Sequence, residues 1–275
     1  MRLPFRQVDV FTSEPHLGNP VAVVHDADGL TDAQMAAFAR WTNLSETTFL
    51  LSPTDPAADY RVRIFTPGTE LPFAGHPTLG TAHAWLEAGG RPASGDIVQE
   101  CGVGLVTVRR EDGRLAFAAP ALLREGSVDE DLLVRTAAAL GIAREGILEA
   151  TWCDNGPGWI GVRLADAASV LALTPSYADL PGKIGVVGAH PAGSDTAIEV
   201  RAFLPPEMGI AEDPVTGSLN AALGQWLAGD FLPDTYVASQ GTALGRRGRV
   251  HVRREGSDVW VGGDTTTILE GTARF

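Results

Sequence analysis

The sequence is poor in cysteine and lysine, and both shortages exclude kinds of protein. Cys101 and Cys153 are the two cysteines among 275 residues, too few for a disulfide framework and without the spacing of a zinc site. Lys183 is the only lysine, and the glycines and proline around it favour a turn residue over a Schiff-base lysine. Two unpaired thiols suit a reducing compartment, so we expect a cytoplasmic protein.

The sequence also lacks long apolar runs and an excess of positive charge. The first six residues include two arginines and lack the apolar run of a signal peptide. The two longest charge-free apolar stretches, residues 71–86 and 214–229, are shorter than a membrane span and indicate buried helices. A net charge of −13 argues against a phosphate-binding surface. We therefore expect neither nucleic acid nor a membrane as a partner.

Four familiar catalytic motifs are absent. The chain has no glycine–lysine phosphate loop, no G-x-G-x-x-G between a strand and a helix, no H-E-x-x-H and no G-x-S-x-G. His76 and His83 share a helical face, but seven residues along a helix span about 10.5 Å, too far for one metal ion. These absences argue against a phosphate loop, a dinucleotide fold, a zinc protease and a serine hydrolase, and we expect no metal site.

What the sequence does contain is a repeat at about half its length. Arg63-Ile64-Phe65-Thr66-Pro67 recurs as Arg201-Ala202-Phe203-Leu204-Pro205, where 201 − 63 = 138. Residues 77–84 resemble residues 214–221 at an offset of 137, and each stretch reads as an apolar helix that begins at its proline. The repeat predicts an α+β fold of two pseudo-symmetric lobes, each a curved mixed sheet wrapped round a central apolar helix. We place the lobes at 1–114 and 115–275, with a last strand that can cross to the first lobe.

Local signals add detail to this outline. Thr31 and Gln34 form a capping box for a helix that ends near residue 42, and Ser127 and Glu130 form another for a helix that ends at 140. Asp112-Gly113 predicts a hairpin turn.

The repeat also predicts a site for chemistry. The residues before the two helix prolines, His76 and Asp213, are expected to lie at equivalent helix starts that face one cleft. Backbone N–H groups near Gly75–Leu79 and Val215–Ser218 would lack helical partners and could hold a carboxylate. Proton transfer could then involve Glu46, His76 or Asp213. Each residue also has an ordinary interpretation. Glu46 could be a solvated carboxylate, His76 a structural histidine and Asp213 a helix N-cap.

Several ordered motifs resemble the PhzF-like isomerases of phenazine biosynthesis, a family with the diaminopimelate-epimerase fold. The resemblance covers nearly the whole chain and rests on residues 9–12, 18–23, 43–49, 63–67, 70–80 and 212–218. It implies a homodimer without a cofactor that moves a proton on a small carboxylic acid. It also implies an active site between the lobes.

The resemblance also implies residue roles. The general acid/base falls on Glu46, and two further catalytic residues fall on His76 and Asp213. The ligand-holding positions are Ser45, Gly75, Thr216, Gly217 and Ser218.

The resemblance leaves several functions open. Epimerases of this fold use one thiol per lobe, and no cysteine stands at either helix start here, which disfavours racemisation by two thiols. The alternatives are a racemase, epimerase or dehydratase of a small amino or hydroxy acid, and a catalytically silent binding protein. The presence of Glu46, His76 and Asp213 together favours an enzyme. Leu219 and Asn220, bulkier than the small residues of the phenazine-pathway isomerase, predict an altered pocket wall.

Overall fold

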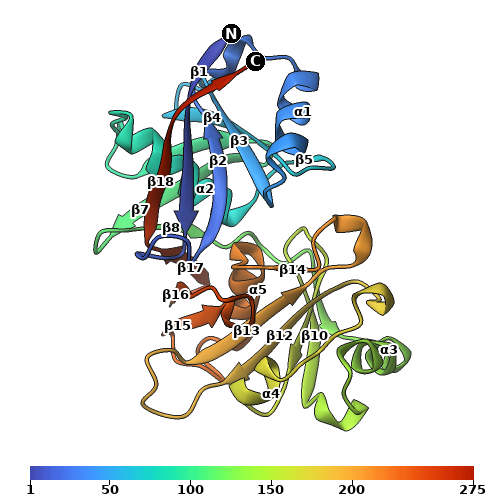
Figure 1. Cartoon of the computed structure of the whole chain (residues 1–275). Helices are drawn as coiled ribbons and strands as arrows, with labels where there is room; N and C mark the ends of the chain where they lie inside the picture. The colour runs from blue at the N-terminus through green and yellow to red at the C-terminus, as the bar shows by residue number, and fades with distance from the viewer. The chain divides into compact units, whose positions relative to one another are not determined.

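The computed structural model describes all 275 residues and divides the chain into two compact units. Unit 1 contains Met1–Ala118 and Gly262–Phe275, and unit 2 contains Ala119–Val261 (Figure 1). The predicted boundary after residue 114 is four residues early, because strand β8 (Arg114–Ala118) forms a hairpin with β7 (Gly104–Glu111). The predicted turn at Asp112-Gly113 joins these strands, with both residues at positive φ as a tight hairpin requires.

Unit 1 is built on one mixed sheet. Its strands, in spatial order from one edge, are β18 (Thr265–Arg274), β1 (Arg2–Val10), β2 (Asn19–Val24), β3 (Glu46–Leu51), β4 (Tyr60–Phe65), β6 (Ile97–Cys101), β7 and β8, with short β5 (Glu70–Leu71) beside β4. The β2–β3 and β4–β6 pairs are parallel and the other pairs are antiparallel. The last strand thus returns to pair with the first.

The sheet of unit 1 curls round a central helix, α2 (Gly75–Glu87). The helix packs against β1, β2, β3, β6, β8 and β18, and its residues from Gly75 to Ala82 are all buried. Gly80 lets the helix approach the sheet closely, since a Cβ there would lie 2.3 Å from a Val21 methyl carbon and 3.0 Å from one of Val10. The predicted arrangement of a sheet round one apolar helix is therefore present in unit 1.

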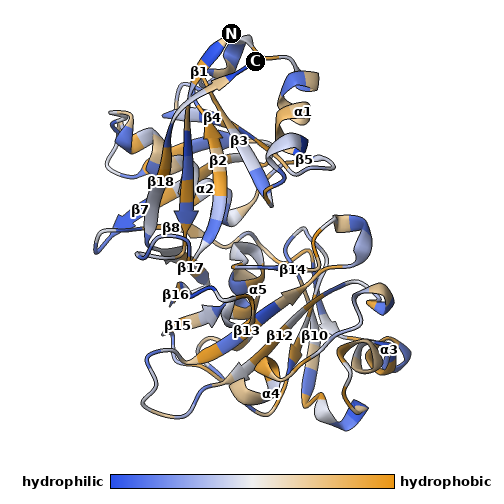
Figure 2. Cartoon of the chain, viewed as in Figure 1, coloured by the Kyte–Doolittle hydropathy of each residue, from blue (hydrophilic) through white to orange (hydrophobic).

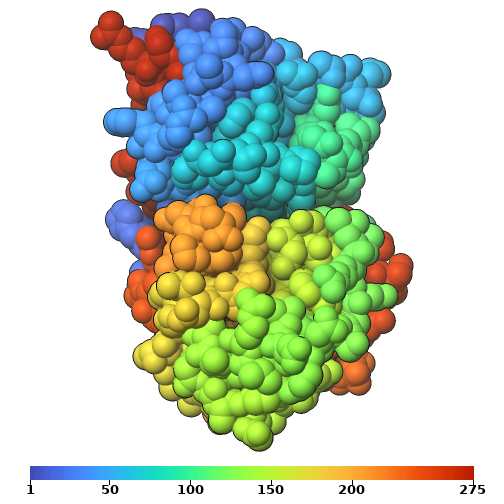
Figure 3. Space-filling model, turned by 90° about the vertical axis from the view of Figure 1, so that its right-hand side faces the viewer, coloured from blue at the N-terminus to red at the C-terminus, as the bar shows by residue number.

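Helix α1 (Asp32–Thr42) covers another part of unit 1. It begins with the predicted capping box, in which Thr31 accepts from the Gln34 amide and the Gln34 side chain accepts from the Thr31 amide. Beside it the two chain ends lie together, and the Phe275 amide donates to the Met1 carbonyl at 2.9 Å (Figure 3).

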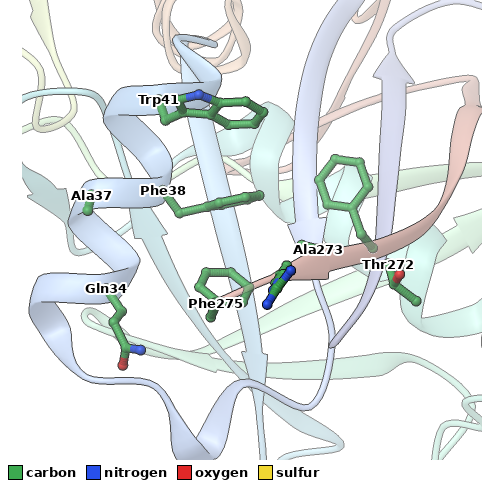
Figure 4. A pocket seen from close by; sticks show the side chains of 9 residues that line it. Gln34, Ala37, Phe38, Trp41, Thr272, Ala273 and Phe275 are labelled. Carbon is green, nitrogen blue, oxygen red and sulfur yellow. The ribbon is translucent and has the colours of Figure 1, made fainter. Parts of the chain in front are cut away.

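An aromatic groove of about 640 Å³ lies between α1 and the end of β18. Trp41, Phe38 and Phe275 lie one above another in it (Figure 4), with ring centroids 6.0 Å apart for Trp41 and Phe38 and 4.8 Å apart for Phe38 and Phe275. The Trp41 side chain is 80% exposed, so this part of unit 1 presents apolar surface to solvent.

Unit 2 repeats the strand pattern of unit 1. Its strands run in the order β9 (Arg124–Ser127), β10 (Glu149–Asp154), β11 (Trp159–Arg163), β12 (Lys183–Ala189), β13 (Ile198–Phe203), β15 (Thr235–Gln240) and β16 (Gly248–Glu255), with short β14 (Glu212–Asp213) beside β13. The parallel pairs are again two, β11–β12 and β13–β15. The last long strand before the chain returns to unit 1 is β17 (Asp258–Gly263). The central helix is α5 (Gly217–Leu227), buried over most of its length.

Two further helices accompany this sheet, α3 (Glu130–Leu140) and the shorter α4 (Ala167–Leu171). Helix α3 has hydrophobic and hydrophilic faces (Figure 2), and its buried face contributes Leu133, Ala137 and Leu140 to the unit's core. The predicted end of α3 at Gly141 is confirmed, with Gly141 at φ 73°. The predicted capping box is wrong: Ser127 lies in β9, which pairs with β10, and the residue before the helix is Asp129.

The two units correspond at an offset that differs from the expected one. Phe65 of β4 pairs with Glu70 of β5, and Phe203 of β13 pairs with Glu212 of β14. The offset is thus 138 for β4 and β13 but 212 − 70 = 142 for the short strands, and 217 − 75 = 142 for the starts of the central helices. The loop that joins β13 to β14 is four residues longer than the loop that joins β4 to β5, which accounts for the change.

This offset corrects the predicted helix starts. Helix α2 starts at Gly75, so Pro77 is its third residue, and α5 starts at Gly217, three residues after Pro214. Asp213 lies in β14 and is not the helix N-cap, which is Thr216.

The predicted equivalence of His76 and Asp213 is also wrong. At the offset of 142, Asp213 corresponds to Leu71 of β5, and His76 corresponds to Ser218, the second residue of α5. The repeated pattern is Glu-x-Pro-x-x-Gly, at residues 70–75 and 212–217.

No helix of either unit combines the length and the apolarity that crossing a bilayer requires.

Candidate active site

Glu46 and His76 lie together in unit 1, although thirty positions apart in the chain. Asn43 ends α1 in the left-handed conformation, at φ 54°, and turns the chain so that Glu46 becomes the first residue of β3. His76 is the second residue of α2. The Glu46 Oε2 atom is 3.4 Å from His76 Nε2, and the side chains are 16% and 5% exposed. Two of the predicted catalytic residues are therefore in contact.

The His76 ring is neutral at pH 7. Burial is the larger effect and lowers the pKa of His76 from 6.5 to about 3, while a hydrogen bond to the Pro20 backbone acts in the opposite direction. Its contact with Glu46 is thus one between a carboxyl group and a neutral ring, not an ion pair. With hydrogen on Nε2 the ring can donate to a Glu46 carboxylate, and with hydrogen on Nδ1 it can accept from protonated Glu46. The two forms differ by one proton on the Glu46 carboxyl group, so Glu46 can take up or release a proton while the His76 ring stays neutral and keeps its contact.

Acid should destabilise the protein through His76. The unfolded chain binds a proton on this residue below pH 6.5 and the folded chain does not until about pH 3, so stability falls as the pH falls through that window. Between pH 7 and pH 5 the wild type should lose about 2 kcal/mol more unfolding free energy than His76→Asn. Urea unfolding of both proteins at the two pH values checks this. Equal losses would show that His76 is already protonated in the folded state.

A loop from β1 to β2 supports His76 from the other side. The Asn19 amide nitrogen is 3.5 Å from His76 Nδ1, and Asn19 is fully buried. Asp9 Oδ2 accepts from the Gly18 amide at 3.1 Å, which anchors the residue before Asn19. A Cβ at position 18 would lie 2.2 Å from the Val10 carbonyl, so only glycine fits. Sequence reasoning gave Asp9 and Asn19 no role, although both stand in the motifs that carry the family resemblance.

The start of α2 provides hydrogen-bond donors next to His76. No side chain caps this helix at Ala74, and its first intrahelical bond within the turn is from Thr78 to the Ala74 carbonyl. The amides of Gly75 and His76 therefore have no acceptor within the helix, and the helix dipole favours an anion at this end. Ser45, half-buried, directly precedes Glu46. The predicted unit 1 residues thus form one local group.

In unit 2, Asp213 and the start of α5 form a second group. Thr216 is the N-cap residue of α5, but its side chain does not cap the helix. Its hydroxyl donates instead to Asp213 Oδ2, at 2.6 Å. The first-turn amides, including those of Gly217 and Ser218, have no intrahelical acceptor. The predicted ligand-holding residues Thr216, Gly217 and Ser218 are therefore adjacent to Asp213.

The loop from β10 to β11 orients Ser218. The Trp159 indole nitrogen donates to Ser218 Oγ at 3.1 Å, and Asn155 Nδ2 donates to the Ser218 carbonyl at 2.9 Å. Asp154 Oδ1 accepts from the amides of Gly156 and Gly158 and holds the loop in shape. Because Ser218 accepts from Trp159, its own hydroxyl proton points elsewhere and is available for another acceptor. These supporting residues were not identified from the sequence.

The predicted change of pocket wall at Leu219 and Asn220 is wrong. Both side chains are fully buried within unit 2. Leu219 packs against Gly185 of β12, where an added Cβ would lie 2.2 Å from a Leu219 methyl carbon. Asn220 donates to Gln240 and to the Thr216 carbonyl. Their bulk fills the core of unit 2 and faces no pocket.

Neither thiol has the environment of an activated cysteine. Burial raises the pKa of Cys153 to about 12 and also raises the pKa of Cys101. A thiolate nucleophile or base needs the opposite shift. No group of three or more His, Cys, Asp and Glu side chains is arranged to hold a metal ion.

Removing both thiols should leave activity unchanged within about threefold, a change small beside the 10²-fold or larger loss of an acid/base group. We choose Cys101→Ser with Cys153→Ala, because alanine avoids a buried hydroxyl in the core. Circular dichroism confirms the fold and steady-state kinetics measures the rate. Inactivity of the folded double variant would restore the two-thiol mechanism.

Comparison with known proteins gives the family of the chain. The family model for phenazine biosynthesis-like proteins, PhzC-PhzF, matches residues 8–271. The chain is 37% identical to antisense-enhancing sequence 1 of Schizosaccharomyces pombe and 35% identical to trans-2,3-dihydro-3-hydroxyanthranilate isomerase of Pseudomonas aeruginosa, in each case over 97% of both chains.

The fold agrees as well. A crystal structure of a PhzF-family protein from Enterococcus faecalis superposes over the full length of both chains, with a TM-score of 0.83 and 27% identity. The expected epimerase-type α+β fold is confirmed, and named isomerases among the relatives identify an enzyme of the isomerase type. The chain belongs to the phenazine biosynthesis-like, PhzC-PhzF, family.

Proposed function

We propose that this isomerase moves a proton on a small carboxylic acid and that Glu46 is its general acid/base. The observation that carries the proposal is the 3.4 Å contact between Glu46 and the buried, neutral His76 at the start of α2. A general base needs a partner that holds its geometry, and the contact with His76 supports this role for Glu46. The amides at the start of α2 support the binding of a carboxylate beside it. Isomerase names among the relatives give the reaction class.

The reaction requires no oxidant or reductant. The Glu46 carboxylate takes a proton from the carbon α or γ to the substrate carboxylate, and the electron pair moves into the conjugated system. The resulting carboxylic acid exchanges its proton with solvent and then delivers a proton to the other end of that system, so the double bond shifts and the overall composition is unchanged. Amides at a helix start stabilise the negative charge that develops on the substrate carboxylate.

The other site residues have supporting roles in this proposal. His76 holds the Glu46 carboxyl group in both of its protonation states, and Asp213 orients the substrate. Ser45, Gly75, Thr216, Gly217 and Ser218 hold the ligand. The proposal includes a homodimer, which light scattering should report as twice the chain mass, and a reaction that uses no cofactor.

The test is a panel of small carboxylic acids incubated with the enzyme in D₂O and followed by proton NMR. The panel includes the acid named in the Pseudomonas aeruginosa relative, together with amino and hydroxy acids. Deuterium at one carbon with a shifted double bond is the expected result. Deuterium at the α carbon with loss of configuration would indicate a racemase, loss of water a dehydratase, and binding without exchange on any acid a silent binding protein.

A further inference from the structure

Gln240, the last residue of β15, is the centre of a buried hydrogen-bond network beside Asp213. Its side chain has no exposed surface. Its Nε2 atom donates to the Asp213 carbonyl at 3.1 Å and to Thr216 Oγ1 at 2.9 Å. Its Oε1 atom accepts from the Thr216 amide at 3.0 Å and from Asn220 Nδ2 at 2.8 Å. One side chain thus joins the end of β14 to the first turn of α5.

The network determines the direction of each hydrogen bond. The Thr216 amide and Asn220 Nδ2 can only donate, so the amide oxygen of Gln240 must face them. Its Nε2 then faces Thr216 and donates to the hydroxyl oxygen. A hydroxyl has one proton, and with this acceptor site occupied the Thr216 proton is directed to Asp213 Oδ2, 2.6 Å away. Asp213 is thereby held as a hydrogen-bond acceptor through that oxygen, which favours the carboxylate.

The backbone around Gln240 supports the same arrangement. Gly241 follows at φ 90°, and a Cβ at this position would lie 2.7 Å from the Pro214 carbonyl oxygen. A Cβ at Gly248, opposite Gln240 in the β15–β16 pair, would lie 2.5 Å from a Val215 methyl carbon. The end of β15 and the start of β16 therefore pack closely against the segment from Asp213 to Thr216.

We propose that Gln240 is a positioning residue of the isomerase, which orients the Asp213 carboxylate through the Thr216 hydroxyl. The proposal rests on the proposed function in one respect, the contact of Asp213 with the substrate. Gln240 itself is buried and touches no substrate.

Unit 1 contains a comparable buried glutamine, Gln99, that forms no hydrogen bond to Thr216 or Asp213. Gln99 of β6 is also fully buried, donates to Thr78 Oγ1 at 3.0 Å and accepts from the Tyr60 hydroxyl at 3.2 Å. Thr78 and Asn220 are each the fourth residue of a central helix. Each unit thus has a buried glutamine that binds this helix position, and the one in unit 2 also binds Thr216 and Asp213. Gln99→Met therefore controls for the loss of a buried glutamine.

The experiment measures the titration of the Asp213 carboxyl by carbon NMR, with Asp213→Asn used to assign the signal. Gln240→Met keeps the side-chain length but removes every hydrogen bond, so the Thr216 proton is free to turn away. The Asp213 titration should then move to higher pH by about one unit, as expected for the loss of a hydrogen bond to a charged group. Gln99→Met should not move it. An unchanged Asp213 titration in Gln240→Met would overturn the proposal.

Variants of Thr216 test the relay. If Gln240→Met does not fold, Gln240→Asn replaces it throughout, since asparagine keeps the amide but withdraws it by one carbon from Thr216 and Asp213. Thr216→Val should raise the pH midpoint of the Asp213 titration as Gln240→Met does. Thr216→Ser keeps the hydroxyl and should have the wild-type midpoint. Adding Gln240→Met to Thr216→Val should change the titration no further. Additive shifts would show that Gln240 acts on Asp213 independently of Thr216 and would overturn the relay.

Turnover separates this proposal from the proposed function. If Asp213 orients the substrate, Gln240→Met should lower kcat by roughly tenfold, and it should have little further effect in an Asp213→Asn background. If Asp213→Asn turns over as the wild type does, the role given to Asp213 is wrong, whereas the titration still decides whether Gln240 positions its carboxylate.

Discussion

Glu46→Gln should lower kcat by between about 10²- and 10⁴-fold, the range that general acid/base groups contribute. Glutamine keeps the shape of the side chain and a hydrogen-bonding atom near His76 Nε2 but cannot accept or return the substrate proton. Ligand affinity should change little, because the amides at the start of α2 remain in place. Steady-state kinetics gives kcat, and calorimetry with the same acid gives Kd.

Two further variants sharpen this result. Glu46→Asp keeps the carboxyl group but withdraws it from His76, so its kcat should lie between those of the wild type and Glu46→Gln. Glu70→Gln removes a carboxylate that is 41% exposed and bound to Arg63, and it should leave kcat unchanged. Turnover by Glu46→Gln within about threefold of the wild type, far from the expected loss, would refute the assigned role.

Arg201→Met should lower the free energy of unfolding by about 3–5 kcal/mol, the cost of leaving a buried charge without its partner. Arg201 donates twice to Glu212, at 2.9 and 2.7 Å, and the two side chains are 6% and 3% exposed. A second branch of Arg201 donates to the Leu173 carbonyl, next to the end of α4. Guanidinium unfolding, with the slope of the transition checked, measures the loss.

The repeat supplies a matched control for this variant. Arg63 binds Glu70 and Asp32 in the same way, at 2.6–2.7 Å, but its own side chain is 24% exposed and those of its partners are 41% and 84% exposed. Solvent screens that network, so Arg63→Met should cost at most about 1 kcal/mol. Adding Glu212→Leu to Arg201→Met should recover part of the loss. Equal destabilisation by the two arginine variants would show that burial does not decide the difference.

The sequence predicted the architecture well because duplication leaves a signal at the level of whole segments. Arg63 and Arg201 stand in corresponding strands, β4 and β13, and both apolar stretches form the central helices. The helix starts were predicted wrongly, because Pro77 and Pro214 are 137 residues apart, nearly the same offset as the 138 residues between Arg63 and Arg201. The four additional residues between β13 and β14 lie in a loop. A loop has no hydrophobic period, so the sequence pattern does not reveal a change in its length.

The sequence named the proposed catalytic residues but not the residues that support them in the structure. The repeat pointed to His76 and Asp213, and the family resemblance gave Glu46, His76 and Asp213 their roles, whereas local pattern alone favoured an ordinary interpretation for each. Gln240 lies far from Asp213 in the sequence, and its amide reads as a polar end to a strand. Only the parallel pairing of β13 with β15 brings it under the start of α5. Asn19 gains its contact with His76 in the same way, from packing between distant segments.

The most direct test of proton transfer by Glu46 is the position of deuterium in the product. A substrate acid identified from the panel is converted in D₂O by the wild type and, in parallel, by Glu46→Gln, and the product is examined by carbon NMR. We expect the wild type to place one deuteron on the carbon at the far end of the shifted double bond, and Glu46→Gln to place almost none in the same time. Equal deuterium uptake by both enzymes, or uptake at the α carbon with loss of configuration and no shift of the double bond, would contradict the account.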